Sequence, residues 1–564
     1  MAQTSLLFPL PLLALSLASP AQGEIHELAV IDNGNPFLGY GNDGAANMGD
    51  LDGDGIDDLV VGCSSGNTNQ LKDGTVFLFS GRTWKEIWRI YGTNQDGRFG
   101  ASVENLGDVD KDGVPDIGIG SPTAPRSSST LGPGMAFVFS GKTHKQIHAI
   151  SSPYSGSNAA FGSRIAGLGD IDGDGHADFM VGAPGDNNRG AVYVYSGKSG
   201  QQLFRLAGND QPTKFGAGLA AIEDMDLDKV GDIAILANSV TRGSTVVNAP
   251  TWIYSGRTGK LIRRVDPVGT LIHSDGLLRL IEDLDGDKKP DLVMNFSGVL
   301  SGKSYRGQVQ VFSSKDGKLL ATCQAPQTQT NISFGEGFDT IPDSNGDGSP
   351  EILVGDRFFV SGLASLGAVH HFEARTGKRQ TSITTPLLAK TQTNFGQSVV
   401  NLGDLNKDGN PDFGARFEAH SVSQQGLSIL CARPLDLTSD TSSLGLFRGG
   451  KVVFYIHAGT TEAGSLCMML GTASGTLPGI LIGKERLLLN NDAYLSFTLA
   501  APLAVFTNNL STLDPQGLGQ IGFTLPTGLP ASIAGKTLHH SCLFLGKSGL
   551  TFANTAVPLE LTRF

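Results

Sequence analysis

The chain has 564 residues, enough for two or more domains, and its 54 acidic against 42 basic residues give a formal charge of −12. This acidic balance argues against nucleic acid or an anionic membrane as a partner, because no basic stripe supplies contacts to phosphate groups. Glycine is the compositional outlier with 76 residues, and together with 29 phenylalanines it indicates many short strands and tight turns.

The first 23 residues are typical of an export signal. Residues 5 to 18 form an apolar run that is too short to span a bilayer and is interrupted by Pro9 and Pro11. Small residues follow at Ala21 and Gly23, where a signal peptidase would cleave. No later stretch reaches about 18 apolar residues, so the sequence predicts a secreted or cell-surface protein without membrane insertion.

After this segment a nine-residue motif close to D-x-D-x-D-G-x-x-D recurs at intervals of about 60 residues. The seven copies begin at Asp50, Asp108, Asp170, Asp224, Asp283, Asp343 and Asp404. A Phe-Gly pair stands nine residues before five of them, at Phe99, Phe161, Phe215, Phe334 and Phe395. An apolar run follows each motif, and in several copies a further apolar segment ends in Ser-Gly, as in GTVFLFSG at 74 to 81.

Each repeat therefore contains three strands and a shorter fourth one, such as residues 85 to 92. Four strands in a period of about 40 to 60 residues are typical of a β-propeller, in which blades pack around an axis. The seven copies predict a seven-bladed propeller over residues 24 to 436. The last repeat lacks a clear fourth strand, so we expect residues 24 to 31 to supply it and to remove an open sheet edge.

The motif places oxygen-bearing side chains at positions 1, 3, 5 and 9 of each loop. Calcium takes six to eight hard oxygen ligands, and a tight loop that turns alternate side chains inward provides them. The sequence predicts up to seven calcium sites, although Lys229 and Lys288 replace the expected glycine in loops four and five. The predicted ligands are Asp50, Asp52, Asp54 and Asp58; Asp108, Asp110, Asp112 and Asp116; Asp170, Asp172, Asp174 and Asp178; Asp224, Asp226, Asp228 and Asp232; Asp283, Asp285, Asp287 and Asp291; Asp343, Asn345, Asp347 and Glu351; and Asp404, Asn406, Asp408 and Asp412.

Two other motifs are rejected on their context. An EF-hand loop also begins D-x-D-x-D-G, but it needs a glutamate at position 12, where the first loop has Val61 in an apolar strand. Residues 62 to 66 match the nucleophile motif G-x-S-x-G, but a strand follows them where a helix is required.

The aspartate loops, the Phe-Gly pairs and Gly182-Ala183-Pro184 together resemble the FG-GAP repeats of the N-terminal β-propeller of integrin alpha subunits. The resemblance covers about residues 24 to 436, and blade one departs from it with Tyr40-Gly41 in place of Phe-Gly. It implies structural calcium loops on one face and an extracellular protein or glycan partner on the opposite face. The loops at 63 to 73, 121 to 133 and 184 to 189 are candidates for that face. We find no D-x-S-x-S motif and no room for an inserted von Willebrand A domain, which argues against integrin-type metal-dependent ligand capture.

Residues 437 to 444 are polar and are expected to form a linker, and from 445 to 564 alternating apolar segments predict a β-sandwich. The expected function is that of a secreted, calcium-binding, non-catalytic propeller protein in extracellular binding or cell adhesion. Two alternatives are open: a polysaccharide lyase or hydrolase built on the propeller, and a structural component of an envelope or matrix.

Overall fold

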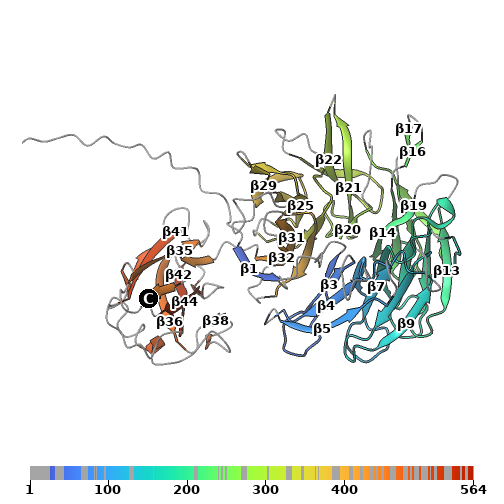
Figure 1. The fold of residues 1–564 in the computed structure, drawn as a ribbon. Helices are drawn as coiled ribbons and strands as arrows, with labels where there is room; N and C mark the ends of the chain where they lie inside the picture. The colour runs from blue at the N-terminus through green and yellow to red at the C-terminus, as the bar shows by residue number, and fades with distance from the viewer. Residues whose placement is uncertain are drawn as a thin grey trace, which may run out of the picture. The chain divides into compact units, whose positions relative to one another are not determined.

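The computed structural model describes residues 26 to 31 and, with gaps in several loops, most of residues 44 to 562. The expected signal segment, residues 1 to 23, lies outside this range. The chain divides into two compact units, one spanning Ile25–Arg433 and the other containing Pro434–Phe564 (Figure 1). Within the described range, no helix has the length and apolar character that a membrane crossing requires.

The first unit is a seven-bladed β-propeller, as the repeats predict. Its described residues form seven four-stranded antiparallel sheets, and the first strands of successive sheets contact one another. The first strand of blade one also contacts that of blade seven, so the ring is closed. These first strands are β2 (Ala45–Asn47), β6 (Ser102–Asn105), β10 (Arg164–Gly169), β14 (Phe215–Ile222), β20 (Leu278–Ile281), β24 (Phe338–Ile341) and β30 (Val399–Gly403).

The remaining strands of each blade follow outward from the ring. The second strands are β3 (Leu59–Cys63), β7 (Ile117–Ser121), β11 (Asp178–Ala183), β15 (Asp232–Ala237), β21 (Asp291–Ser301), β25 (Glu351–Asp356) and β31 (Asp412–Ala419). The third strands are β4 (Thr75–Phe79), β8 (Met135–Phe139), β12 (Ala191–Tyr195), β18 (Thr251–Tyr254), β22 (Ser304–Phe312), β28 (Ala368–Glu373) and β32 (Gln424–Cys431). The outer strands of blades one to six are β5 (Glu86–Tyr91), β9 (Gln146–Ser151), β13 (Gln202–Ala207), β19 (Leu261–Val265), β23 (Leu319–Gln324) and β29 (Lys378–Ile383). Two small hairpins, β16 (Val240–Arg242) with β17 (Thr245–Val247) and β26 (Val360–Ser361) with β27 (Ala364–Ser365), extend blades four and six.

Burial follows the place of each strand in its blade. Every residue of β3, β11 and β15 is buried, because neighbouring blades cover both faces of these sheets. The outer strands β5 and β9 contain only partly buried and exposed residues, since one of their faces meets solvent. The sequence contrast between continuous apolar runs and mixed segments thus corresponds to middle and outer strands.

The phenylalanines of several Phe-Gly pairs pack against aromatic side chains of the third strand. Phe161 packs edge-on against Tyr193 of the third strand at a ring distance of 5.6 Å, and Phe215 packs in the same way against Trp252 at 5.2 Å. The glycine that follows Phe161 has a φ of 87°, and a Cβ there would lie 2.3 Å from the backbone oxygen of Met135. The pair therefore combines a core side chain, the phenylalanine, with a backbone turn at which only glycine fits.

The N-terminal segment closes the ring, which confirms the expectation for residues 24 to 31. Strand β1 (His26–Ile31) pairs antiparallel with β32, the third strand of blade seven, from His26 opposite Cys431 to Ile31 opposite Leu427. The last blade is thus built from both ends of the propeller sequence, in the order β1-β32-β31-β30. This pairing removes the open edge that β32 would present.

Deleting residues 26 to 31 should lower the melting temperature and cause self-association, because the unpaired edge of β32 can pair with another chain. Size-exclusion chromatography and thermal unfolding of the deletion variant would measure both effects. A synthetic peptide of residues 26 to 31 should restore the monomer, and a deletion variant that stays monomeric with an unchanged melting temperature would contradict the role of β1.

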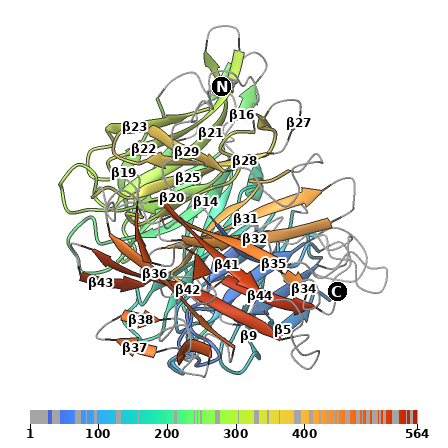
Figure 2. The ribbon, with the colours of Figure 1, turned by 90° about the vertical axis from the view of Figure 1, so that its left-hand side faces the viewer.

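The C-terminal unit contains two main β-sheets whose faces pack together. One has the order β33-β35-β41-β39, and the other has β34-β44-β42-β36-β40 with β43 added to β42 (Figure 2). Buried His540 of the second sheet contacts the rings of Phe454, Phe506 and Phe523 of the first sheet at 5.0 to 5.7 Å. The strands are β33 (Asp436–Ser439), β34 (Ser443–Gly445), β35 (Gly450–His457), β36 (Leu466–Thr472), β37 (Ile480–Ile482), β38 (Glu485–Leu487), β39 (Phe506–Thr507), β40 (Leu510–Thr512), β41 (Leu518–Leu525), β42 (Thr537–Gly546), β43 (Gly549–Phe552) and β44 (Val557–Thr562), of which β37 and β38 form a separate hairpin.

The boundary between the two units differs from the one we expect. It lies between Arg433 and Pro434, and residues 437 to 444, the expected linker, lie largely within β33 and β34. Strand β33 pairs with β35, and β34 pairs in parallel with β44 near the end of the chain. The strand partner of β34 is distant in the sequence. Local composition therefore does not reveal that this short polar segment forms strands.

The stability of the C-terminal unit should depend on pH through His540. Burial lowers the pKa of His540 to about 3, and the charge of His539 adds to this effect, while the ordinary value is 6.5. Below pH 6.5 the imidazole of His540 binds a proton in the unfolded chain but not in the folded unit, so protonation favours unfolding. The free energy of unfolding is therefore fully retained above pH 6.5. It should decrease as the pH falls from 6.5 towards 3, by up to about 1.4 kcal/mol per pH unit.

Hydrogen exchange of β42 in the intact chain would measure this loss. A His540→Phe variant keeps the aromatic packing and should show a much weaker acid dependence in this strand. Equal acid sensitivity of the two proteins would assign the effect to other groups.

Candidate metal centre

The aspartate loops occupy equivalent places in the blades. Each loop connects the first and second strands of its blade, as loop one does between β2 and β3. Because the blades are arranged in a ring with the same strand order, these loops lie on one face of the propeller. Connections between second and third strands lie on the opposite face, since antiparallel strands alternate in direction.

In five loops the carboxylates at positions 1, 3 and 9 come together. Each group offers one oxygen per residue, and all three oxygens lie within 4.8 Å of one another. The groups are Asp50, Asp52 and Asp58; Asp108, Asp110 and Asp116; Asp170, Asp172 and Asp178; Asp224, Asp226 and Asp232; and Asp283, Asp285 and Asp291. In loops six and seven, Asn345, Asp347, Asn406 and Asp408 lie outside the described residues, so the structure describes only part of these two predicted sets.

The carboxylate at position 9 of each loop is buried and accepts hydrogen bonds from the loop backbone. Asp116 is fully buried and accepts hydrogen bonds from the backbone N–H groups of Val109 at 2.7 Å, Asp110 at 3.1 Å and Gly141 at 3.0 Å. Burial raises the pKa of Asp116 to about 6 and that of Asp291 to about 7, although these backbone hydrogen bonds act in the opposite direction. A carboxylate under this desolvation is stabilised by a nearby cation.

The carboxylates at positions 1, 3 and 5 accept hydrogen bonds from backbone N–H groups of the same loop, and these bonds stabilise its turn. Asp108 accepts from the backbone N–H of Asp112 and of Gly113, both at 2.9 Å. Asp110 and Asp112 each accept from the backbone N–H two residues further on, at 3.2 and 3.0 Å. These contacts close the turn that brings the carboxylates at positions 1 and 3 to the position-9 carboxylate, whereas the predicted ligands at position 5 of these five loops are not members of the converging groups. Hard oxygen ligands of this kind are the ones that calcium takes.

The Ser-Gly motif has a role in the site that sequence reasoning missed. The glycine N–H donates to the position-9 carboxylate in four blades, from Gly81 to Asp58, Gly141 to Asp116, Gly197 to Asp178 and Gly256 to Asp232, at 2.8 to 3.1 Å. A Cβ on any of these glycines would lie 1.9 to 2.0 Å from the backbone oxygen of loop position 8. In blade five Ser314 takes this place, and its N–H lies further from Asp291, at 3.3 Å. The signal was present in the recurrence of Ser-Gly, with its glycine 19 to 25 residues after the position-9 aspartate in blades one to four.

The described loops fit a hard divalent cation. Their donor sets are carboxylate oxygens that converge within a turn, and soft nitrogen or sulfur ligands are not part of them. In loops four and five the turn survives the loss of glycine, since Lys229 and Lys288 adopt φ values of 72° and 67°. The pKa values of Asp224 and Asp283 are lowered: desolvation opposes the shift, and backbone hydrogen bonds from Lys229 and Lys288, respectively, outweigh it.

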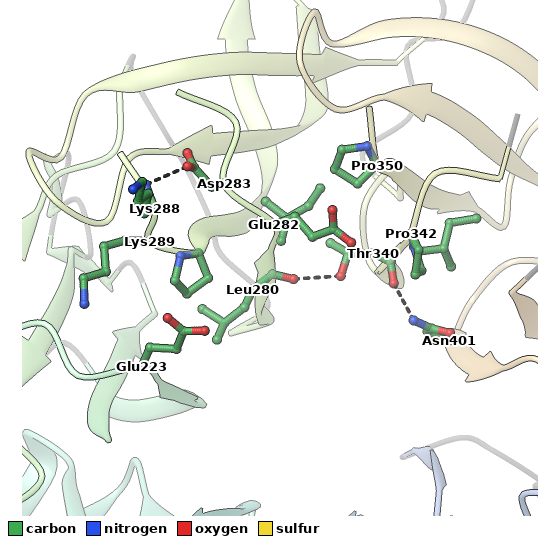
Figure 3. A pocket seen from close by; sticks show the side chains of 13 residues that line it. Glu223, Leu280, Glu282, Asp283, Lys288, Lys289, Thr340, Pro342, Pro350 and Asn401 are labelled. Carbon is green, nitrogen blue, oxygen red and sulfur yellow. Dashed lines mark hydrogen bonds between the residues drawn. The ribbon is translucent and has the colours of Figure 1, made fainter. Parts of the chain in front are cut away.

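A cavity of about 510 Å³ opens beside loops four and five, near the first strands of blades four to seven (Figure 3). Its walls include Leu280, Pro342 and Pro350, and Glu223 and Glu282 add carboxylates to the lining. Both glutamates stand directly before the first aspartate of their loops, where loops one, two, three and seven have a glycine of positive φ. The cavity is therefore a local feature of the blades that depart from the repeat.

The fold and the loops together define a β-propeller built from FG-GAP repeats. A model of the FG-GAP repeat matches residues 161–195, and a model of the FG-GAP-like repeat matches residues 50–119. The propeller distantly resembles the N-terminal propeller of integrin alpha subunits.

Three integrin alpha subunits illustrate this similarity. The chain is 28% identical to integrin alpha-5 of Xenopus laevis over 233 residues, which cover 38% of this chain and 21% of that protein. It is 29% identical to integrin alpha-V of Gallus gallus over 227 residues (36% and 20%), and 34% identical to integrin alpha-IIb of Homo sapiens over 160 residues (26% and 15%). The matched part thus spans about a fifth of the length of these relatives or less.

Proposed function

We propose that this protein is a secreted calcium-binding propeller that acts in extracellular binding or cell adhesion without catalysis. The observation that carries this proposal is the convergence of carboxylates around a buried position-9 aspartate in five loops. Without a cation, such groups repel one another and raise the pKa of the buried carboxyl. Extracellular calcium modules bind at about 10⁻⁴ to 10⁻³ M, so the ion would be present outside a cell.

The face opposite the calcium loops is the proposed partner surface. Of the loops expected there, residues 65 to 73 and 126 to 131 lie outside the described residues, whereas the loop at 184 to 189 is described. In that loop Asp186 is buried. It accepts a hydrogen bond from Tyr193 at 2.5 Å and forms an ion pair with Arg205 at 3.0 Å. These contacts hold a connection between strands in one conformation, which supports a preorganised binding surface.

A polysaccharide-degrading enzyme on the same scaffold is the second candidate. The constellation that would favour it is in blade six, where His370 Nδ1 lies 2.8 Å from Ser382 Oγ and His370 Nε2 lies 3.8 Å from Asp356. His370 and Asp356 are both fully buried, and Phe334, Phe359 and Phe372 surround the imidazole. A group this enclosed is better placed to hold strands together than to reach a polymer.

The purified protein should be incubated with a panel of extracellular polysaccharides and cell surfaces, with calcium or with chelator. We expect calcium-dependent retention without chain cleavage. Cleavage of a polymer would replace the adhesion proposal by the enzymatic one, and retention on no surface in either condition would leave a structural matrix role as the better explanation. A His370→Phe variant serves as the matched control for catalysis, because only an enzymatic role of His370 would make cleavage depend on it at unchanged stability.

Calcium should also raise the melting temperature. A site with a dissociation constant of about 10⁻⁴ M is stabilised by about 1.4 kcal/mol at 1 mM calcium, since the ion binds the folded loop alone. Thermal unfolding with 1 mM calcium and with chelator would show this shift, with magnesium at the same concentration as the control. Identical melting temperatures in all three conditions would contradict calcium binding.

A further inference from the structure

In loop four, an arginine of the same blade lies on one of the predicted ligands. Arg257 follows the Ser-Gly motif of blade four, and its Nε lies 3.2 Å from Oδ2 of Asp228, the position-5 carboxylate. The same guanidinium donates through Nη2 to the backbone oxygen of Asp228 at 3.1 Å. The guanidinium of Arg257 therefore contacts both the side chain and the main chain of Asp228, which is predicted to be a calcium ligand.

A second positive charge reaches loop four from the next blade. Lys289, at position 7 of loop five, donates from Nζ to the backbone oxygen of Asp224, the first residue of loop four. Lys289 is partly buried, so its ammonium is held between the two blades. Lys229, at position 6 of loop four, adds a further charge where loops one to three have glycine.

Loop two provides a matched comparison within the same chain. Lys142 stands at the repeat position of Arg257, and it donates to the backbone oxygen of Asp112 at 2.8 Å. The Asp112 carboxylate accepts from the neutral hydroxyl of Ser140 at 3.4 Å. The difference follows from side-chain chemistry, because the planar fork of arginine contacts two oxygens at once and lysine presents a single point charge.

A calcium ion in loop four would have to displace Arg257 from Asp228 and approach two further cations. The Arg257 ion pair is half-exposed, so by itself it contributes little stability. Extracellular calcium sites are weak, however, and a hundredfold loss moves a dissociation constant of about 10⁻⁴ M to about 10⁻² M, which is about ten times the free concentration of about 1 mM. The competing cations together therefore need to weaken binding by only about two orders of magnitude to leave such a loop mostly without calcium.

We propose that Arg257 and Lys289 are built-in counter-cations of loop four, which keep its turn closed and prevent calcium binding there at millimolar concentration. Blade four would then keep its loop structure when calcium is removed, while loops one to three depend on the ion. This inference rests on the proposed function, in which loops one to three bind calcium.

The test counts bound calcium per molecule on the intact protein at 1 mM calcium, by native mass spectrometry and by metal analysis after dialysis. Position-3 carboxylates are replaced one at a time, in Asp52→Asn, Asp110→Asn, Asp172→Asn and Asp226→Asn. We expect each of the first three variants to lose one ion and Asp226→Asn to lose none. The double variant Arg257→Gln with Lys289→Gln should gain one ion, and Lys142→Gln, its control in loop two, should leave the count unchanged. Circular dichroism and melting temperature confirm that each variant is folded.

The possible outcomes separate the inference from its premise. Loss of one ion in Asp226→Asn would overturn the inference, because loop four would then bind calcium despite its cations. An unchanged count in both Asp226→Asn and the double variant would overturn the role given to Arg257 and Lys289. Unchanged counts in all three variants of loops one to three would instead overturn the proposed calcium function itself.

Discussion

Replacing Asp178 with alanine is expected to destabilise the propeller by about 3 to 5 kcal/mol, in chelator as well as in calcium. This buried carboxylate accepts three backbone N–H groups, those of Ile171 at 2.9 Å, Asp172 at 3.3 Å and Gly197 at 2.8 Å. Alanine leaves these donors without their acceptor, and each buried unsatisfied group costs about 1 to 3 kcal/mol. Calcium would no longer compensate, because the loop also loses a ligand.

Urea unfolding in calcium and in chelator would measure this effect. Asp172→Ala is the control, since Asp172 is exposed and accepts one backbone N–H, from Asp174 at 3.0 Å. We expect it to cost about 1 kcal/mol in chelator and more in calcium. An Asp178→Ala protein as stable as Asp172→Ala would show that the buried carboxylate does not anchor the loop.

Replacing Gly197 with alanine should destabilise blade three by about 3 kcal/mol or more. The added Cβ would lie 1.9 Å from the backbone oxygen of Ala177 and 3.1 Å from Val109. The loop and the end of β12 would have to separate, and this movement also breaks the hydrogen bond from the Gly197 N–H to Asp178. Blade five shows the required adjustment, because Ser314 occupies the same place with the longer hydrogen bond.

Gly173→Ala is the matched control for this prediction. Gly173 lies in the same aspartate loop with a φ of 84°, but a Cβ there would have no heavy atom within 4 Å. Its cost should be the backbone strain alone, about 1 to 2 kcal/mol. Denaturant unfolding of both variants would compare them, and equal losses would mean that backbone strain, rather than the close approach to Ala177, determines the effect.

Much of the propeller could be predicted because its signals are local and repeated. The seven loops, the apolar runs behind them and the incomplete last repeat predicted the blade number and the closing strand β1. The spacing of Asp50, Asp52 and Asp58 likewise predicted a converging carboxylate group, and the structure brings these side chains together. Local spacing suffices here because one nine-residue turn contains all three carboxylates.

The amino-acid sequence by itself determined the repeat, the convergence of the carboxylates at positions 1, 3 and 9 in five loops, and the identity of the closing strand. Only the tertiary structure decided that the glycine of Ser-Gly supports Asp178, that Arg257 lies on Asp228, and that the expected linker after residue 436 forms strands. In each of these cases the partners are separated by about 20 to 120 residues, and chain folding brings them together. Periodicity reports what each segment buries, whereas contacts between distant segments depend on how the blades and sheets pack.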